Sequence, residues 1–470
     1  MSGLPFASLT DTARAIAHGE VTSRAVTEAC LHRIAEVDPQ VHAFVAVDEA
    51  RALAAADEAD RAQAAGRRLG PLHGVPLAHK DMYYRAGEIS GCGSKIRAEW
   101  RPDHTATVLE RLDAAGAITL GRLAMVEFAM GPHGYNQHLP QCRNPWDRDY
   151  IPCGSSSGSG VSVGARLVFG SLGSDTGGSI RCPAAASGVV GLLPTNGRVS
   201  RCGAMPMSFS LDAVGPLART VRDAARLLGV IAGADPRDAS TAQVPVPDYE
   251  AGLGTRLDGL TIGIPDRYFH DGVDDEVSRA LDASRAVFRQ LGASVREVVI
   301  PAWMDEIADL HPLVMKAEGA ANHMEWMRTR RDDYSVEVGN RLEAGFFVLA
   351  TDYIQALKLR GSFLGELLRG AFAEVDLLHT PVITKLLPTI EQTRTSSGPA
   401  YLDMVVSLTR NTKVVNYLGL PAISVPCGFD HRGLPIAFQL IGRPFAEPDL
   451  LVAAHGYEQA TDWWRRAPAL

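Results

Sequence analysis

Short strand-like runs alternate with helical stretches along most of the chain, and this alternation constrains the fold more than any other feature. The runs span residues 75–78, 117–120, 260–264, 295–300, 376–380, 422–426 and 436–441. Between two of them, apolar residues recur at helical spacing, and Gly292 marks the end of that predicted helix. Alternation of this kind is typical of helices packed on a largely buried sheet. The sequence therefore predicts an α/β fold.

The 470 residues are predicted to form a single domain. The sequence contains no fixed-period repeat and no low-complexity tract, and residues 233–258, rich in Gly, Asp and Pro, are interpreted as a surface excursion rather than a linker. We expect an N-terminal helical segment, 1–70, to pack on a core formed by 71–220. Residues 221–470 are expected to supply the remainder of the sheet and its covering helices.

The composition argues against several classes of protein. Lys and Arg total 46 and Asp and Glu total 54, so the formal net charge is −8 and no basic face for nucleic acid is expected. No uninterrupted apolar run approaches the ~18 residues that a membrane helix needs. The N-terminus shows no basic patch followed by an apolar segment, the pattern of a secretory signal. We predict a cytoplasmic protein with no nucleic-acid partner and no membrane partner.

The cysteines and histidines form no recognisable metal-binding pattern. The seven cysteines are widely scattered, and neither C-x-x-C nor H-E-x-x-H occurs. His133 and His138 lie near each other, but no third ligand accompanies them. We therefore predict reduced thiols and no metal site.

Residues 152–183 are the least ordinary stretch of the chain. Glycine and serine gather in two clusters, 154–160 and 170–179, which an apolar, helix-compatible segment separates. Backbone N–H groups of such glycines can converge on a phosphate or on a developing oxyanion. The stretch contains no lysine, which argues against a phosphate-binding P-loop. Ser179 instead follows two glycines, which places its hydroxyl at the end of a run of free N–H groups. Acyl transfer needs such an arrangement, a nucleophile beside an oxyanion hole.

A serine nucleophile needs a base, and Lys80 is a candidate. It ends the apolar run 75–78, where burial would lower its pKa and leave a neutral amine. The alternative, a lysine that reaches solvent and pairs with Asp81, stays open at this stage. The G-x-S-x-G pattern at 154–158 is not interpreted as a hydrolase elbow, because the segment before it is polar and interrupted by proline.

Three motifs resemble those of the amidase signature family, the Ser-cisSer-Lys hydrolases. They are Gly74–Asp81, Pro152–Ser159 and Gly173–Arg181, the last reading G-S-D-T-G-G-S-I-R. Secondary matches at 127–131, 143–146, 188–197, 211–216 and 419–442 extend the resemblance over nearly the whole chain. It implies a single-domain amidase-signature fold, with a central mixed, twisted β-sheet covered by helices on both faces.

The resemblance also implies the roles of the site residues. Ser179 would be the nucleophile, Ser155 the serine that follows a cis peptide bond and relays the proton, and Lys80 the neutral base. Neither a metal nor a cofactor is implied. The oxyanion hole would consist of the backbone N–H groups of Thr176, Gly177, Gly178 and Ser179.

Other residues near these motifs are given supporting roles. Asp175 and Arg181 are interpreted as a buried pair that braces the turn, and Ser156 as further structural support. Cys153 stands where the family has glycine, and we interpret it as a small packing residue rather than a nucleophile. His79 is likewise not interpreted as catalytic: we expect its hydrogen bonds to be satisfied, or its ring to line the pocket. The predicted walls of the substrate pocket are Met130, Gly131, Tyr135, Met205 and Phe209.

The predicted function is hydrolysis of a C–N amide bond through a serine acyl-enzyme. Small aryl or alkyl amides are the expected substrates, with carbamates or esters also considered, and a homodimer is allowed. The alternative is the glutaminase subunit of a tRNA-dependent amidotransferase. A non-catalytic protein that binds an anion is disfavoured, because Lys80, Ser155 and Ser179 occur together.

Overall fold

The computed structural model describes residues 4–67, 69–396 and 398–470, and within them the strands form one mixed sheet of 11 strands. The strand order is β1-β3-β2-β4-β6-β5-β10-β11-β9-β7-β8. The strands are β1 (Phe44–Val47), β2 (Pro76–Lys80), β3 (Ile118–Leu123), β4 (Gly170–Asp175), β5 (Val190–Leu193), β6 (Ala213–Ala218), β7 (Thr261–Pro265), β8 (Ser294–Val298), β9 (Leu377–Pro381), β10 (Ala422–Phe429) and β11 (Pro435–Gly442).

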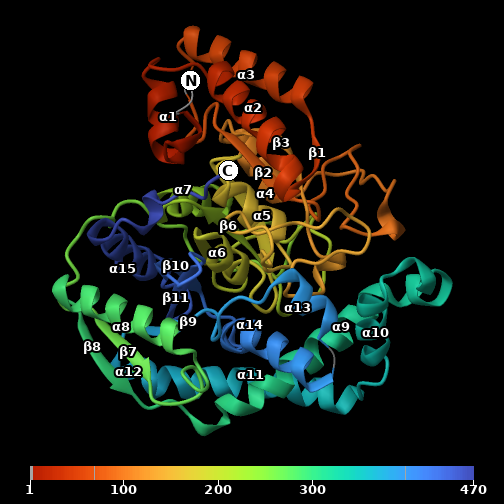
Figure 1. The fold of residues 1–470 in the computed structure, drawn as a ribbon, viewed down its shortest axis with the longest axis vertical. Helices are drawn as coiled ribbons and strands as arrows, with labels where there is room; N and C mark the ends of the chain where they lie inside the picture. Colours follow the sequence, from red (N-terminus) through yellow and green to blue (C-terminus); the bar gives the residue numbers. More distant parts are fainter. Residues whose placement is uncertain (1–3, 68, 397) are drawn as a thin grey trace.

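Helices flank this sheet along its length (Figure 1). They are α1 (Leu9–Ala17), α2 (Ser23–Val41), α3 (Glu49–Ala64), α4 (Thr107–Ala114), α5 (Ser157–Gly164), α6 (Arg181–Ser187), α7 (Val221–Ile231), α8 (Asp275–Gln290), α9 (Ile307–Thr329), α10 (Val336–Gly345), α11 (Ala350–Arg369), α12 (Ala371–Glu374), α13 (Ile390–Thr395), α14 (Gly398–Leu418) and α15 (Glu447–Ala460). The predicted α/β fold with a mixed sheet flanked by helices is confirmed.

The division of the chain at residues 70 and 220 stays a prediction. Helices α1, α2 and α3 lie together at one end of the molecule (Figure 1), and residues 1–3 and 68 of that predicted segment lie outside the described residues. The sheet itself crosses both predicted boundaries, since β1 pairs with β3 and β5 pairs with β10.

The centre of the sheet places two functional motifs at the same edge. Strand β2 pairs in parallel with β4, with Ala78 opposite Ser171. Because parallel strands end on the same side of a sheet, Lys80 at the end of β2 and Asp175 at the end of β4 are brought together. Helix α5 packs on both strands.

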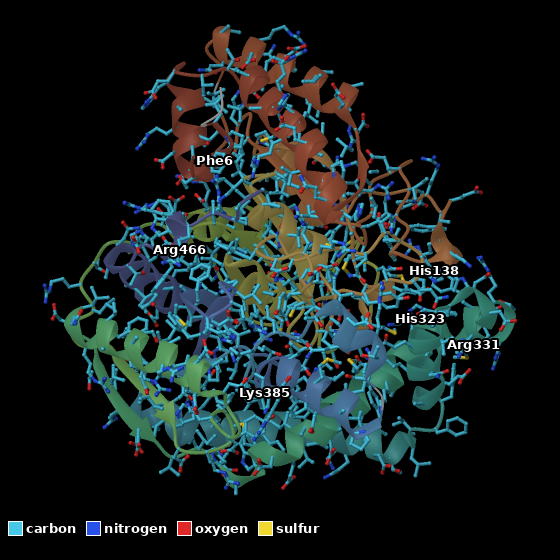
Figure 2. All side chains as sticks on the ribbon, in the orientation of Figure 1. Phe6, His138, His323, Arg331, Lys385 and Arg466 are labelled. Atoms are coloured by element: carbon cyan, nitrogen blue, oxygen red, sulfur yellow. The ribbon has the colours of Figure 1, made fainter. Side chains whose placement is uncertain are left out.

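Glycine allows the close packing between β4 and α5. A Cβ added to Gly173 would lie 2.9 Å from Ser156 Oγ, so a larger residue would push the second motif away from the first. Figure 2 shows side chains filling the space between the ribbons.

Within the described ranges, no helix is both long enough and apolar enough to cross a membrane.

Candidate active site

Lys80 and Ser155 are in direct contact in the protein interior. Lys80 Nζ donates a hydrogen bond to Ser155 Oγ at 2.7 Å and another to Ser174 Oγ at 2.9 Å. The side chains of Lys80 and Ser155 are both completely buried, with 0% exposure. The lysine at the end of β2 therefore lies inside the protein and does not reach solvent.

Burial lowers the pKa of Lys80 to about 7, although the nearby carboxylates of Asp212 and Asp175 act in the opposite direction. The adjacent Asp81 does not pair with Lys80. Its carboxylate accepts a hydrogen bond at 2.5 Å from Arg122 on β3. The alternative left open by the sequence, a lysine paired with Asp81, is therefore excluded, and a large fraction of neutral amine is present near pH 7.

The loop before α5 presents Ser155 to this lysine. The peptide bond between Gly154 and Ser155 is cis, as the family resemblance implies. The Gly154 N–H donates to the carbonyl of Pro132 at 2.7 Å, and a Cβ on Gly154 would lie 3.0 Å from the carbonyl oxygen of Gly131. Glycine is therefore the residue that this close approach of two backbones permits.

Cys153 occupies a position that favours glycine. Its φ of 56° is in the left-handed region, which explains why the family motif has glycine here. Its side chain is completely buried, and burial raises the pKa of the thiol well above its ordinary value. A protonated, inaccessible thiol is a poor nucleophile, which agrees with its interpretation as a packing residue.

Ser179 lies in the loop between β4 and α6 and is partly exposed, unlike Lys80 and Ser155. In the part of the chain that the structure describes, its hydroxyl makes no hydrogen bond with Ser155 or Lys80. Hydrogen bonds of a catalytic group are often long without substrate and shorten in the reacting complex. Ser179 is thus the member of the predicted triad that a substrate can approach from solvent.

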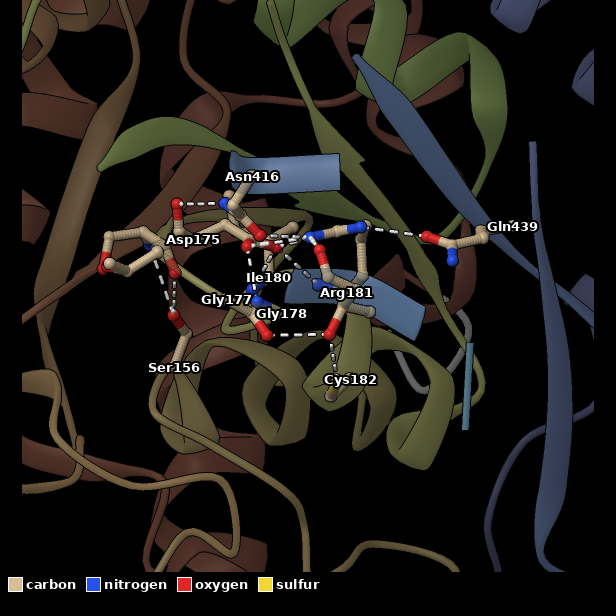
Figure 3. A network of polar contacts seen from close by, with 12 residues as sticks. Ser156, Asp175, Gly177, Gly178, Ile180, Arg181, Cys182, Asn416 and Gln439 are labelled. Carbon is tan, nitrogen blue, oxygen red and sulfur yellow. Dashed lines mark hydrogen bonds and ion pairs between the residues drawn. The ribbon is translucent and has the colours of Figure 1, made fainter. Parts of the chain in front are cut away.

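A buried ion pair fixes the turn that carries Ser179 (Figure 3). Arg181 Nε lies 3.1 Å from Asp175 Oδ2, and both side chains have 0% exposure. Arg181 also donates to Gln439 Oε1 and Asn416 Oδ1, at 2.9 and 2.6 Å. Burial opposes ionisation of Asp175, but the Arg181 guanidinium outweighs it and lowers the pKa of this carboxyl.

One of the four predicted oxyanion donors is already engaged. The N–H of Gly178 donates to Asp175 Oδ1 at 2.6 Å, so in this structure the group predicted as an oxyanion donor is not free for a substrate. The turn closes so tightly that the Asp175 carboxylate caps it. His311 Nε2 donates a hydrogen bond to the Thr176 carbonyl at 2.8 Å. Because the C=O and N–H groups of a trans peptide point in opposite directions, the Gly177 N–H of the same peptide points away from His311.

Ser156 connects the two motifs through the backbone. Its hydroxyl donates to the carbonyl of Ser174 and accepts from the N–H of the same residue, each at 3.2 Å. Ser174 in turn contacts Lys80. This reciprocal bond therefore keeps the Ser155 loop and the end of β4 in register with the lysine.

The histidines are engaged elsewhere. His79 donates from Nδ1 to the Lys80 carbonyl at 3.1 Å, and burial lowers its pKa to about 3. His133 lies 3.0 Å from the Tyr401 hydroxyl, and burial lowers its pKa to about 4. His138, on the same side of the molecule as His323 (Figure 2), contacts Glu127 at 3.1 Å. Among the described residues, no group of three or more His, Cys, Asp or Glu is placed to hold a metal ion.

The five residues predicted to line the substrate pocket lie in different parts of the structure. Met205 and Phe209 line a cavity of about 180 Å³ that Ser174 also lines. Met130 lines another, much smaller cavity. Tyr135 lies beneath the guanidinium of Arg394, 5.3 Å from ring to cation, and Gly131 lies against Gly154. The five residues therefore do not form one continuous wall.

Several residues of the site were not predicted from the sequence. Ser174 stands inside the G-S-D-T motif and could have been found there. The others come from distant segments: His311 on α9, Thr412, Lys413 and Asn416 on α14, Gln439 on β11, and Asp212, whose Oδ1 accepts from the Thr176 hydroxyl at 2.6 Å. No local pattern marks these positions.

Comparison with known proteins shows the family of the chain. A sequence model of the family described as Amidase matches residues 25–451. The chain belongs to this family. Among curated relatives, a glutamyl-tRNA(Gln) amidotransferase subunit from Geobacter sp. (strain M21) is 39% identical over 96% of each chain, and the corresponding protein from Azotobacter vinelandii is 40% identical over 98% of this chain and 99% of its own.

Solved structures give the same fold. A chain from a vestigial protein complex linked to the evolutionary origins of an s-triazine catabolic enzyme superposes with a TM-score of 0.90 at 32% identity, covering 97% of this chain and 99% of its own. The native peptide amidase from Stenotrophomonas maltophilia superposes with a TM-score of 0.85 at 32% identity, covering 97% and 98%. This chain is therefore an amidase-family enzyme that hydrolyses C–N bonds.

The relatives correct one prediction. We predicted no nucleic-acid partner from the net charge of −8. The curated relatives are named as one subunit of an amidotransferase that acts on glutamyl-tRNA, which contradicts that prediction. The charge of one polypeptide does not determine what a whole assembly binds, and this is why the inference failed.

Proposed function

We propose that this chain hydrolyses a carboxamide through an acyl-enzyme on Ser179. The observation that carries the proposal is the contact of 2.7 Å between a buried Lys80 Nζ and Ser155 Oγ. The neutral amine of Lys80 takes a proton from Ser155, which takes one from Ser179 as its oxygen attacks the substrate carbonyl carbon. The proton then returns to the leaving nitrogen, the C–N bond breaks, and water releases the acid from Ser179.

The negative oxygen of the tetrahedral intermediate needs hydrogen-bond donors that are already in position. We assign this role to the backbone N–H groups of Thr176, Gly177 and Ser179. The supporting observation is that the loop is fixed from both sides. Asp175 holds the Gly178 N–H, and the Thr412 hydroxyl donates to the Gly177 carbonyl at 2.7 Å.

For the physiological role, the amide-hydrolysing subunit of a tRNA-dependent amidotransferase is better supported than the stand-alone amidase of our main prediction. Curated relatives from that enzyme are 38–41% identical over nearly the full chain. In this role the chain would release ammonia from glutamine, for transfer within an assembly. The stand-alone amidase is the second candidate, supported by the similarity to peptide amidase and by the cavity beside Ser174.

The two roles are separated by measuring ammonia release from glutamine and amine release from a panel of para-nitroanilides, aliphatic amides and carbamates. The chain is assayed alone and after co-purification with partner subunits. The amidotransferase role predicts that glutamine is the best substrate and that partners raise its turnover. Rapid turnover of neutral amides by the isolated chain, with no turnover of glutamine in either preparation, would refute it.

A further inference from the structure

Three arginines gather around the loop 165–169, which connects α5 to β4. Arg33 on α2 donates from Nε to the carbonyl oxygen of the first residue of this loop at 2.9 Å. Arg166 belongs to the loop itself, and the guanidinium of Arg219, directly after β6, lies 5.4 Å from the centre of the Phe169 ring. Burial lowers the pKa of Arg166 to about 9, and the charges of Arg219 and Arg33 lower it further. The three guanidinium groups are therefore neighbours.

These three residues form an arginine cluster at the opposite end of β4 from Ser179. Gly170, the first residue of β4, pairs with Ala218, the residue before Arg219. Ser179 instead comes after Asp175, the last residue of β4. The arginine cluster is therefore a different place in the fold from the candidate active site.

Two of the three arginines are almost fully buried, and one of these has buried donors without a partner. Arg166 and Arg219 are each 4% exposed. Arg166 donates to the carbonyl oxygens of Trp464 and Arg466, the latter labelled in Figure 2, at 3.3 and 2.8 Å. These acceptors are neutral and leave its charge in place. Within the described residues, Nε and Nη2 of Arg219 have no hydrogen-bond partner, although neither atom is accessible to solvent.

The acidic side chains near the arginine cluster are engaged elsewhere or exposed. Burial lowers the pKa of Arg219 to about 10, although the charge of Asp223 on α7 acts in the opposite direction. The Asp223 carboxylate accepts hydrogen bonds from the backbone N–H groups of the first two residues of α1, at 3.2 and 2.9 Å. Glu36, whose charge acts on Arg33, is exposed to solvent. In the part of the chain that the structure describes, none of the three arginines lies within 4.0 Å of a carboxylate oxygen.

A buried cation is costly to keep without an opposite charge beside it, and guanidinium groups bind oxyanions through paired N–H donors. We infer that the arginine cluster is a binding site for a small tetrahedral oxyanion, an inorganic phosphate or sulfate ion. Three guanidinium groups can serve more than the two oxygens of a carboxylate, and the burial of Arg166 and Arg219 favours a free ion over a larger phosphorylated molecule. The ion would connect α2, the loop before β4 and the end of β6, so its binding should stabilise the fold whatever the activity at Ser179.

Equilibrium dialysis of the full chain against radiolabelled inorganic phosphate, with sodium chloride holding the ionic strength constant, tests the site directly. The wild type is expected to bind one phosphate per chain with saturation, and sulfate should displace it at lower concentration than chloride does. Arg219→Met should abolish this binding, and Arg33→Met should weaken it by about 10-fold, as expected for loss of one charge-assisted hydrogen bond. Arg256→Met removes an exposed arginine and is the matched control, which should bind phosphate as the wild type does.

Thermal unfolding gives a second readout, because an ion that binds only the folded chain raises the Tm. Phosphate should raise the Tm of the wild type and of Arg256→Met more than that of Arg219→Met. An equal rise in all three would be a general salt effect and would overturn the inference, as would full phosphate binding in Arg219→Met or displacement by chloride as effective as by sulfate. If Arg219→Met does not fold, the wild type and Arg33→Met decide: no saturable binding in the first, or an unchanged affinity in the second, refutes the site.

Discussion

At the scale of the residue, Lys80 can act as a base only while its amine stays out of water and apart from carboxylates. Its side chain has 0% exposure, and the neighbouring Asp81 is held by Arg122. Asp212 and Asp175 are near enough to raise its pKa, but Asp212 is engaged by the Thr176 hydroxyl and Asp175 by Arg181. The pKa of about 7 is the balance of burial against these two charges.

Replacing Ser179 by alanine should remove nearly all turnover and leave the fold intact. Nucleophile and base act as a unit, so a loss of about 10³-fold or more in kcat is expected. Initial rates on a simple amide and circular dichroism check both parts. Ser294→Ala, at an exposed position on the edge strand β8, is the matched control and should retain full activity. Near-normal activity in Ser179→Ala would remove the basis of the proposed mechanism.

At the scale of the element, the turn between β4 and α6 depends on the buried pair of Asp175 and Arg181. Arg181→Met leaves the Asp175 carboxylate buried without its partner, and we expect a loss of about 3–5 kcal/mol in the free energy of unfolding. Urea titration measures it. Arg256→Met removes an exposed pair with Asp258 and should leave the midpoint unchanged. A midpoint for Arg181→Met equal to that of the wild type would show that the pair does not stabilise the turn.

The same pair gives stability a defined dependence on pH. The pKa of Asp175 is lower in the folded chain than in the unfolded one. Its contribution is therefore complete above the unfolded pKa, ~3.9, and is lost as the pH falls through the folded value. As the pH falls into the acid range, the free energy of unfolding should therefore decrease less steeply in Asp175→Asn than in the wild type. Equal slopes would contradict the assigned direction of the shift.

Gly178 tests how closely the turn packs. Its φ is +127°, and an added Cβ would lie 2.4 Å from Thr412 Oγ1. Gly178→Ala should therefore destabilise the protein by about 1–3 kcal/mol and lower turnover. The control is Gly361→Ala on α11, where no atom lies within 4 Å, and it should stabilise the helix by about 0.5–1 kcal/mol. Urea titration of both variants measures the contrast, and equal effects would contradict the packing argument.

The sequence predicted the parts of this site that local motifs encode. Lys80, Ser155 and Ser179 stand in motifs, and the cis bond before Ser155 agrees with the resemblance. Asn416 and Gln439 could not be predicted, because they reach Arg181 from segments more than 200 residues away. Strand β4 was also missed as a strand, since its glycines and serines have low strand propensity and its place is fixed by packing.

At the scale of the whole molecule, the sheet and the helix packed on it exclude water from the Lys80 side chain. Strand β2 lies between β3 and β4, and α5 packs on the same strands. Elements α9, α14 and β11, which hold the turn of Ser179 in place, come from the second half of the chain, whereas the triad motifs come from the first. The catalytic residues and the residues that position their turn therefore come from different parts of one fold.

The most direct test of the central claim is the pH dependence of kcat/KM on a neutral amide. The neutral amine of Lys80 is the active form, so kcat/KM should rise as pH increases, with an apparent pKa near 7, and become level in mild alkali. Lys80→Ala should abolish the rise with most of the activity, and Lys80→Arg should not restore it, because arginine does not give up its proton. A rise centred near ~10.4, the value of free lysine, or an unchanged profile in an active Lys80→Ala variant would contradict the account.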